Sequence, residues 1–165
     1  GIAIVSQHVI LLNESLRDNL VLGLGRDVPD DEIRAVLQTT QLDDMLASMP
    51  EGLDTALGDA GSRLSAGQMQ RVSIARAMLK RASFLILDEA TSALDSITET
   101  RVQQTIERAL EGTTSLVIAH RLSTIRNADL IAVLDGGCIV EMGTLAELLE
   151  RKGLFHELWE HQTFS

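Results

Sequence analysis

Two patterns of apolar residues run along the chain, short unbroken runs and residues at helical spacing. Residues 1–5, 84–87 and 116–119 form unbroken runs, which favour strands buried on both faces of a parallel sheet that helices cover. The spaced residues predict helices. These helices carry Leu16 and Leu20; Ile33, Val36 and Leu37; and Leu42, Met45 and Leu46; three more span 66–79, 98–110 and 154–161. Alternating strands and helices of this kind predict an α/β fold.

Helix caps and turns divide these elements. Asn13 is a predicted N-cap for the first helix and Ser65 for the helix over 66–79, because a short polar side chain can accept a hydrogen bond from an unpaired amide. Thr144 with Glu147 matches a capping box for a further helix. Asp-Gly-Gly at 135–137 separates two short apolar runs, which predicts a hairpin whose turn needs positive φ.

Length and composition indicate one globular domain. The 165 residues are 45% hydrophobic, which is enough for a substantial core. A net charge of −10, with lysine only at positions 80 and 152, argues against a nucleic-acid partner, because phosphate binding needs clustered Lys and Arg. The single cysteine, Cys138, cannot form an internal disulfide and is expected to be buried in a reducing compartment. No apolar run approaches the roughly eighteen residues of a membrane span.

Two adjacent carboxylates, Asp88 and Glu89, follow the apolar run over 84–87. Open α/β sheets bind ligands at the carboxyl ends of their strands. Successive side chains leave a strand in opposite directions, so one carboxylate can hold a metal while the other addresses a water. The alternative is a buried strand that ends in a solvated acidic turn.

Polar side chains also follow the other two strand runs. Gln7 comes just after 1–5, and His120 comes directly after 116–119. The carboxyl ends of parallel strands share one edge of a sheet, so both side chains could lie near Asp88. Taken alone, each favours a structural role, as a polar strand end or as a histidine with a satisfied hydrogen bond.

The start of the helix over 66–79 is a candidate anion site. The first amides of a helix have no intrahelical partner, and the helix dipole is positive there. Ser65 and Gly67 lie at this end. A capped helix without a ligand is the alternative.

Five motifs in order resemble the nucleotide-binding domain of ATP-binding-cassette (ABC) transporters of the exporter type. LSAGQ at 64–68 looks like the signature, FLILDE at 84–89 like Walker B, and SALD at 92–95 like the D-loop. His120 resembles the switch histidine, and Gln7 in IVSQ resembles the Q-loop glutamine. The resemblance implies a P-loop NTPase (RecA-like) parallel-sheet core with an inserted helical subdomain.

The resemblance also divides the chain. It implies one partial ABC ATPase domain over 1–165, in which about 13–80 form the helical subdomain and signature helix. Residues 1–12 and 81–165 would form the core sheet and the C-terminal helices. No GxxxxGK[ST] phosphate loop occurs in the sequence. The chain is therefore expected to be the C-terminal two-thirds of such a domain, without the Walker A strand and loop.

Carried over residue by residue, the resemblance implies a site for ATP and Mg²⁺. Asp88 would hold the metal through water, and Gln7 would also address it. Glu89 would polarise the attacking water, and His120 would position the γ-phosphate.

A second group would act on the ATP of an opposite subunit. Ser65, Ala66, Gly67 and Gln68 would complete that subunit's site, and Asp95 would communicate across the interface. Ala66 departs from the family, which most often has glycine there, and we expect a small cost in approach distance.

The function implied is that of an ATP-hydrolysing motor domain, coupling hydrolysis to export across a membrane. The implied partners are a second ABC ATPase domain, in a homo- or heterodimer, and a transmembrane domain on the same parent chain, with no nucleic acid. The implied location is the cytoplasmic face of a membrane, the inner membrane in a bacterium. Alternatives are a soluble ABC ATPase of DNA repair or the ribosome, and a truncated, non-catalytic partner of a full-length ABC protein. The 165-residue chain alone is expected neither to bind nor to hydrolyse ATP.

Overall fold

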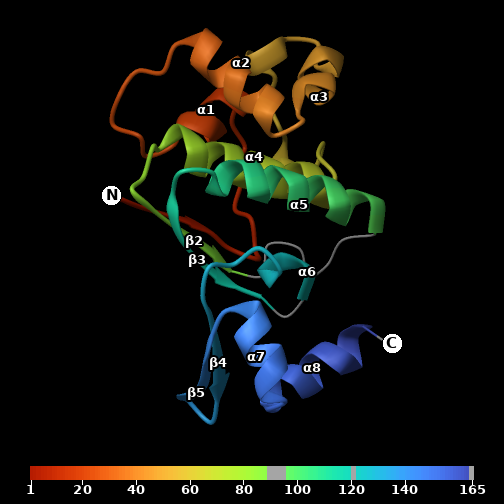
Figure 1. Ribbon diagram of the computed structural model, residues 1–165. Helices are drawn as coiled ribbons and strands as arrows, with labels where there is room; N and C mark the ends of the chain where they lie inside the picture. The colour runs from red at the N-terminus through yellow and green to blue at the C-terminus, as the bar shows by residue number, and fades with distance from the viewer. Residues whose placement is uncertain (89–95, 120–121, 164–165) are drawn as a thin grey trace. The chain divides into compact units, whose positions relative to one another are not determined.

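The computed structural model describes residues 1–88, 96–119 and 122–163 (Figure 1). It divides into two compact units, unit 1 (Gly1–Ile118) and unit 2 (Ala119–Ser165). Unit 1 contains β1 (Ile2–Val5), α1 (Leu16–Val21), α2 (Asp30–Thr39), α3 (Asp43–Ser48), two short 3₁₀ helices (Gly52–Asp54 and Asp59–Gly61), α4 (Ala66–Leu79), β2 (Phe84–Asp88), α5 (Ser96–Leu110) and β3 (Thr114–Ile118). Unit 2 contains α6 (Leu122–Ile125), β4 (Ile131–Asp135), β5 (Cys138–Gly143), α7 (Leu145–Arg151) and α8 (Leu154–Thr163).

The sheet of unit 1 is parallel, in the order β1-β2-β3. Val5 of β1 pairs with Leu87 of β2, and Asp88 of β2 pairs with Ile118 of β3. α4 and α5 lie side by side over this sheet (Figure 1). The predicted α/β fold with a parallel sheet is therefore confirmed.

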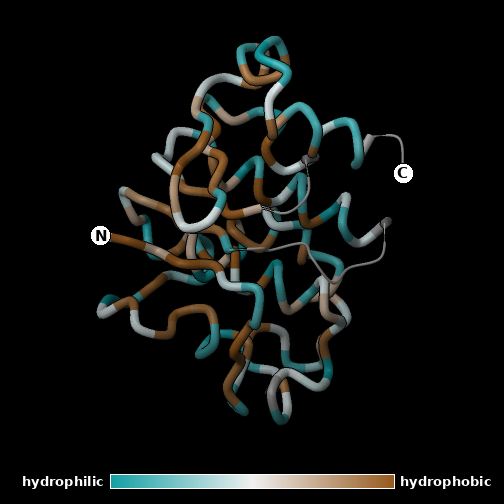
Figure 2. Tube along the Cα trace, turned by 90° about the horizontal axis from the view of Figure 1, so that it is seen from below, coloured by the Kyte–Doolittle hydropathy of each residue, from teal (hydrophilic) through white to brown (hydrophobic). Residues whose placement is uncertain are grey.

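Among the described residues of unit 1, only one face of this sheet is covered. Alternate residues such as Val5 and Leu87 are buried in the sheet cluster, which also takes in Ile74 and Ala77 of α4 and Val102, Ile106 and Ala109 of α5. The other side chains form what we call the bare face, in which Ile2 is 55%, Ile4 63%, Leu116 50% and Ile118 46% exposed. Figure 2 shows the hydrophobic colour along the N-terminal strand. The expectation of burial on both faces is wrong for β1 and β3, because both covering helices lie on the same side.

A second core of unit 1, the helical cluster, packs α1, α2 and α3 against α4. Its fully buried members include Leu16, Leu20, Ile33, Leu37 and Leu42, and α4 contributes Val72, Ala75 and Leu79. α4 therefore supplies side chains to both cores of unit 1. The finer division of the chain into 13–80 and the remainder stays a prediction.

The start of α1 corrects one expectation. Its N-cap is Ser15, whose Oγ accepts a hydrogen bond from the Asp18 N–H, in place of Asn13. Ser15 itself is extended, with φ of −67° and ψ of 163°, and it pairs with Ala56 in an isolated antiparallel bridge. The helix can begin only after that bridge.

Unit 2 is built on the predicted hairpin. β4 and β5 are antiparallel, with Asp135 opposite Cys138, and the two turn residues Gly136 and Gly137 have φ of 53° and 80°. The capping box of Thr144 and Glu147 at α7 is confirmed. The core consists of Ile131, Val133, Leu148 and Phe155. Cys138 is exposed, not buried as expected, because it begins β5 directly beside the turn.

Candidate functional site

The three strands of the unit 1 sheet end at a common edge, and polar residues follow there. Asp88 is the last residue of β2, and its partner Ile118 is the last residue of β3. Gln7 is exposed and lies just beyond the end of β1. The fold thus brings Asp88 and the segment leading into Gln7 to one edge. Glu89, Asp95 and His120 lie outside the described residues.

Asp88 occupies the bare side of the sheet. It alternates with the buried Leu87 and pairs with Ile118, so its half-buried carboxylate leaves the strand on the face that α4 and α5 do not cover. A ligand could approach it from that side without displacing α4 or α5. The predicted role of Asp88 at a metal stays a prediction.

Oxygen ligands suit Mg²⁺, which proteins hold through one or two carboxylates together with waters and substrate phosphates. Asp88 and Gln7 offer a carboxylate and an amide oxygen at the same edge. Among the described residues, no group of three or more His, Cys, Asp or Glu could hold a metal by itself. Asp88 and Gln7 therefore fit a metal that also takes oxygens from water and from a phosphate.

The N-terminus of α4 forms a complete capping box. Ser65 Oγ accepts from the Gln68 N–H at 3.2 Å, and Gln68 Oε1 accepts from the Ser65 N–H at 2.8 Å. The first intrahelical bond runs from the Met69 N–H to the Ser65 carbonyl at 2.9 Å. No acceptor among the residues that the structure describes bonds to the amides of Ala66 and Gly67, which are therefore the free donors of the first turn in this part of the chain. Ser65 can still donate its hydroxyl proton.

Gly67 has a second, structural role that sequence reasoning missed. It is buried, and a Cβ built on it would lie 2.0 Å from Cγ2 of Thr98 in α5. The absence of a side chain therefore allows α4 and α5 to approach. The available signal was a glycine inside a helical pattern, which often marks close packing.

Asn19 and Arg76 hold the segment that follows Gln7. Asn19 is fully buried; its Oδ1 accepts from the Leu12 N–H at 2.8 Å, and its Nδ2 donates to the Leu12 carbonyl at 3.1 Å. Arg76 of α4 donates from Nε to the Asn19 carbonyl at 2.8 Å and from Nη1 to the Ile10 carbonyl at 3.2 Å. These bonds connect α1, α4 and the segment 10–12.

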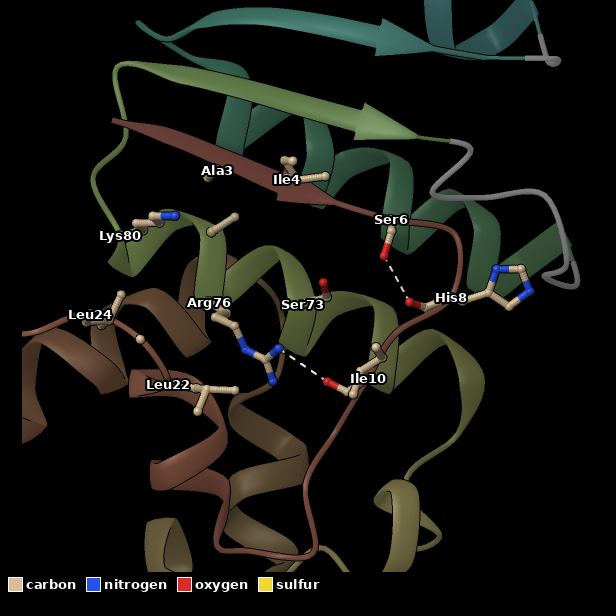
Figure 3. A pocket seen from close by; sticks show the side chains of 12 residues that line it. Ala3, Ile4, Ser6, His8, Ile10, Leu22, Leu24, Ser73, Arg76 and Lys80 are labelled. Carbon is tan, nitrogen blue, oxygen red and sulfur yellow. Dashed lines mark hydrogen bonds between the residues drawn. The ribbon is translucent and has the colours of Figure 1, made fainter.

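A hollow of about 300 Å³ lies beside this network, between β1, the loop after α1, and α4 (Figure 3). Its apolar lining includes Ile4, Ile10 and Leu22, and its charged lining consists of Arg76 and Lys80. Ile4, Ile10 and Leu22 are exposed by 63%, 74% and 44%. Sequence reasoning missed this hollow, although Arg76 and Lys80 are spaced to share a helix face.

The parallel sheet covered by helices is of the α/β class, and the matches to ABC transporter proteins identify the fold as that of a P-loop NTPase. The model of the ABC transporter family matches residues 1–92. The chain belongs to this family, and the prediction of an exporter-type nucleotide-binding domain is confirmed.

Known relatives are transporters much longer than this chain. An ATP-dependent lipid A-core flippase of Thiobacillus denitrificans is 52% identical over 157 residues, covering 95% of this chain and 27% of the relative. An ABC multidrug transporter, MDR2, of Trichophyton interdigitale is 47% identical over 163 residues, covering 98% and 12%. The structure of a bacterial Atm1-family ABC exporter with ATP bound superposes with a TM-score of 0.84 at 40% identity, covering 98% and 28%. Among the described residues, no helix is long and apolar enough to cross a membrane.

Proposed function

We propose that this chain is part of the ATP-hydrolysing motor of an ABC exporter, in which hydrolysis drives movement of a substrate across a membrane. The observation that carries the proposal is the shared strand edge, where Asp88 ends β2 directly before Glu89 and Gln7 follows β1. Membership of the ABC family supports it.

At this edge the carboxylates of Asp88 and Glu89 would have different roles. Asp88, on the bare side of the sheet, would hold Mg²⁺ through water. Glu89 would accept a proton from the attacking water, and Gln7 and His120 would orient the water and the γ-phosphate. ATP would supply the phosphoryl group, and Mg²⁺ would neutralise the charge that develops on it. The residues contribute mainly by position and electrostatics.

A second ATPase domain would provide the opposite half of each site. The free amides of Ala66 and Gly67, with the hydroxyl of Ser65, suit a phosphate, because a helix N-terminus favours negative charge. Gln68 is committed to the capping box, so its role would be to fix the helix start. Asp95 would communicate across the interface. Assembly of two domains would then complete both sites.

The transmembrane part of the exporter would dock at the hollow between β1 and α4. Apolar side chains as exposed as Ile4, Ile10 and Leu22 favour a covering partner. Arg76 bonds directly to the Ile10 carbonyl, and residue 10 belongs to the segment that follows Gln7. A displacement of Ile10 by the docked partner would therefore be transmitted through the backbone to Gln7 at the proposed site.

The cargo would be chosen by the transmembrane part. This chain is about equally similar to a flippase named for lipid A-core and to a multidrug transporter, so its chemistry is compatible with different cargoes. The motor would work at the cytoplasmic face of the membrane.

Replacement of Glu89 by Gln in the full-length exporter tests the proposal. Gln keeps the size and the hydrogen bonding but removes the basic carboxylate, so ATP should still bind while turnover falls by at least about 100-fold. Phosphate release and nucleotide binding are measured on the same preparation. Glu111→Gln, after the end of α5, is the matched control and should keep normal turnover. Near-normal hydrolysis by Glu89→Gln would remove Glu89 from the proposed role.

A further inference from the structure

We propose that the hollow beside α4 recognises its partner through a carboxylate, so that the docking segment carries an Asp or Glu among apolar residues. This inference rests on the proposed function, because the occupant is taken to be a segment of the transmembrane part. It adds the chemistry by which that segment is selected.

The charge of the hollow is one-sided. Arg76 and Lys80 both line it, and no acidic residue does. The chain as a whole carries a net charge of −10, so a lining with two cations and no acid stands out from the general balance. The neighbouring Glu32 is itself paired with Arg26 and Arg81. A carboxylate is the group that complements them.

Two other arginines of unit 1 have their positive charge neutralised by ion pairs with carboxylates. Arg17 donates to both Asp30 and Asp54, and Arg26 forms an ion pair with Glu32 at 2.6 Å. Arg76 instead donates to backbone carbonyls only, and its Nη2 is buried without a hydrogen-bond partner among the described residues. Burial lowers the pKa of Arg76, and no acid counteracts that shift.

The two cations have different parts in the recognition. Nη2 of Arg76 is shielded, so this guanidinium contributes its field from behind the wall of the hollow. Lys80 is exposed at the end of α4, and no ion pair occupies it within the described residues. Lys80 is therefore the group that pairs directly with the incoming carboxylate.

The apolar part of the hollow fixes where that carboxylate must lie. Figure 3 shows Ile4 on one side, Leu22 and Ile10 on the other, with Arg76 between the latter two. An apolar side chain of the partner can enter between these walls, and an acid about one helical turn away on the same face would reach Lys80. The expected occupant is a short helix with both.

Photocrosslinking in the full-length exporter tests the inference. A benzophenone amino acid placed at Ile10 should crosslink to a segment of the transmembrane part, and mass spectrometry should find an Asp or Glu within about one turn of the crosslink. Lys80→Glu should lower the yield several-fold, and exchanging the identified acid for Lys should restore it. Lys152→Glu makes the same charge change in unit 2 and should leave the yield unchanged.

The outcomes separate this inference from the proposed function. The charge recognition is overturned if the crosslinked transmembrane segment has no acid, or if Lys80→Glu leaves the crosslinking yield unchanged. Either result leaves docking intact. An active exporter that gives no crosslink to the transmembrane part overturns docking at this hollow as well. If Lys80→Glu fails to fold, Lys80→Met removes the charge at similar length and carries the same comparison.

Discussion

Gly67 serves two demands at one position. Its amide is one of the two free donors at the start of α4, and its missing side chain admits Thr98 of α5. The close approach of α5 excludes a Cβ at this position, whereas an amide that donates to a ligand does not by itself require glycine. The neighbouring Ala66 is exposed and meets only the first demand, so a methyl group is tolerable there.

Gly67→Ala should therefore destabilise the complete ATPase domain. A Cβ at 2.0 Å from Thr98 Cγ2 forces a shift, and overpacking of this kind costs about 1–3 kcal/mol, against a gain in helix propensity of about 0.5–1 kcal/mol. Urea unfolding measures the difference. Thr98→Ser, which removes the methyl group and keeps the hydroxyl, should restore part of the loss in the double variant. An unchanged midpoint for Gly67→Ala would contradict the packing role.

Single residues also show where local sequence stops being informative. Ser65 was predicted as an N-cap and is one, because capping depends on the residue and its own helix. Asn13 was predicted by the same reasoning and is not a cap, because pairing of Ser15 with the distant Ala56 decides where α1 begins. The hollow beside Arg76 was missed for a similar reason, since its walls come from three separate segments.

At the scale of elements, one arginine ties α1 to α2. Arg17 of α1 donates to Asp30, the first residue of α2, and at 2.8 Å to Asp54. The hydrogen bond from Arg17 lowers the pKa of Asp30, and the positive charges of Arg17 and Arg34 add to the shift. Because Asp30 is exposed, the pair is screened by salt and its contribution is modest.

The ion pair between Arg17 and Asp30 should make the free energy of unfolding fall at acid pH. A carboxyl with a lowered pKa in the folded state stabilises it above the ordinary pKa of 3.8, and this contribution disappears as pH falls below that value. The unfolding free energy of the wild-type domain should therefore approach that of Asp30→Asn as pH falls from about 5 to 2. Asp31→Asn, the neighbouring residue in the same first turn, should show a smaller convergence. If the unfolding free energies of the two proteins differ by the same amount at every pH, the ion pair between Arg17 and Asp30 contributes nothing to stability.

The strands illustrate what a hydrophobic pattern can and cannot predict. The unbroken runs correctly predicted β1, β2 and β3 and their parallel arrangement. They did not reveal that α4 and α5 lie on the same side, leaving Ile4 and Leu116 about half exposed or more. A pattern records which surroundings a side chain favours, whereas the element that supplies them depends on the rest of the fold.

For the molecule as a whole, we expect the strand edge alone to be insufficient for nucleotide binding. The sequence contains no Gly-rich loop with a lysine to hold the phosphates. Each charge-assisted hydrogen bond that such a loop makes contributes about 1.5–3 kcal/mol, so affinity should fall by many powers of ten. Calorimetry of the 165-residue chain with millimolar Mg-ATP should show no binding, and an ATPase assay no activity above background. The complete domain is the control, and a saturable micromolar site on the short chain would contradict the expectation.

The proposed site could be read from the sequence only as far as single motifs allow. The order of motifs identified the family, and strand ends placed Asp88 and Gln7 at one edge. The contacts that hold the edge in place, through Asn19 and Arg76, depend on residues that no motif singles out, because buried hydrogen bonds join segments far apart in the chain.

α4 packs into the sheet cluster and the helical cluster at once, and this has a consequence for hydrogen exchange. Its amide protons cannot be released by opening either core alone, since the other core still holds the helix. Exchange in the middle of α4 should therefore occur only when all of unit 1 unfolds, while the ends of α2 and α3 exchange through local fluctuations. α4 would then move as a rigid helix, so that a displacement of the helical cluster is transmitted directly to the sheet.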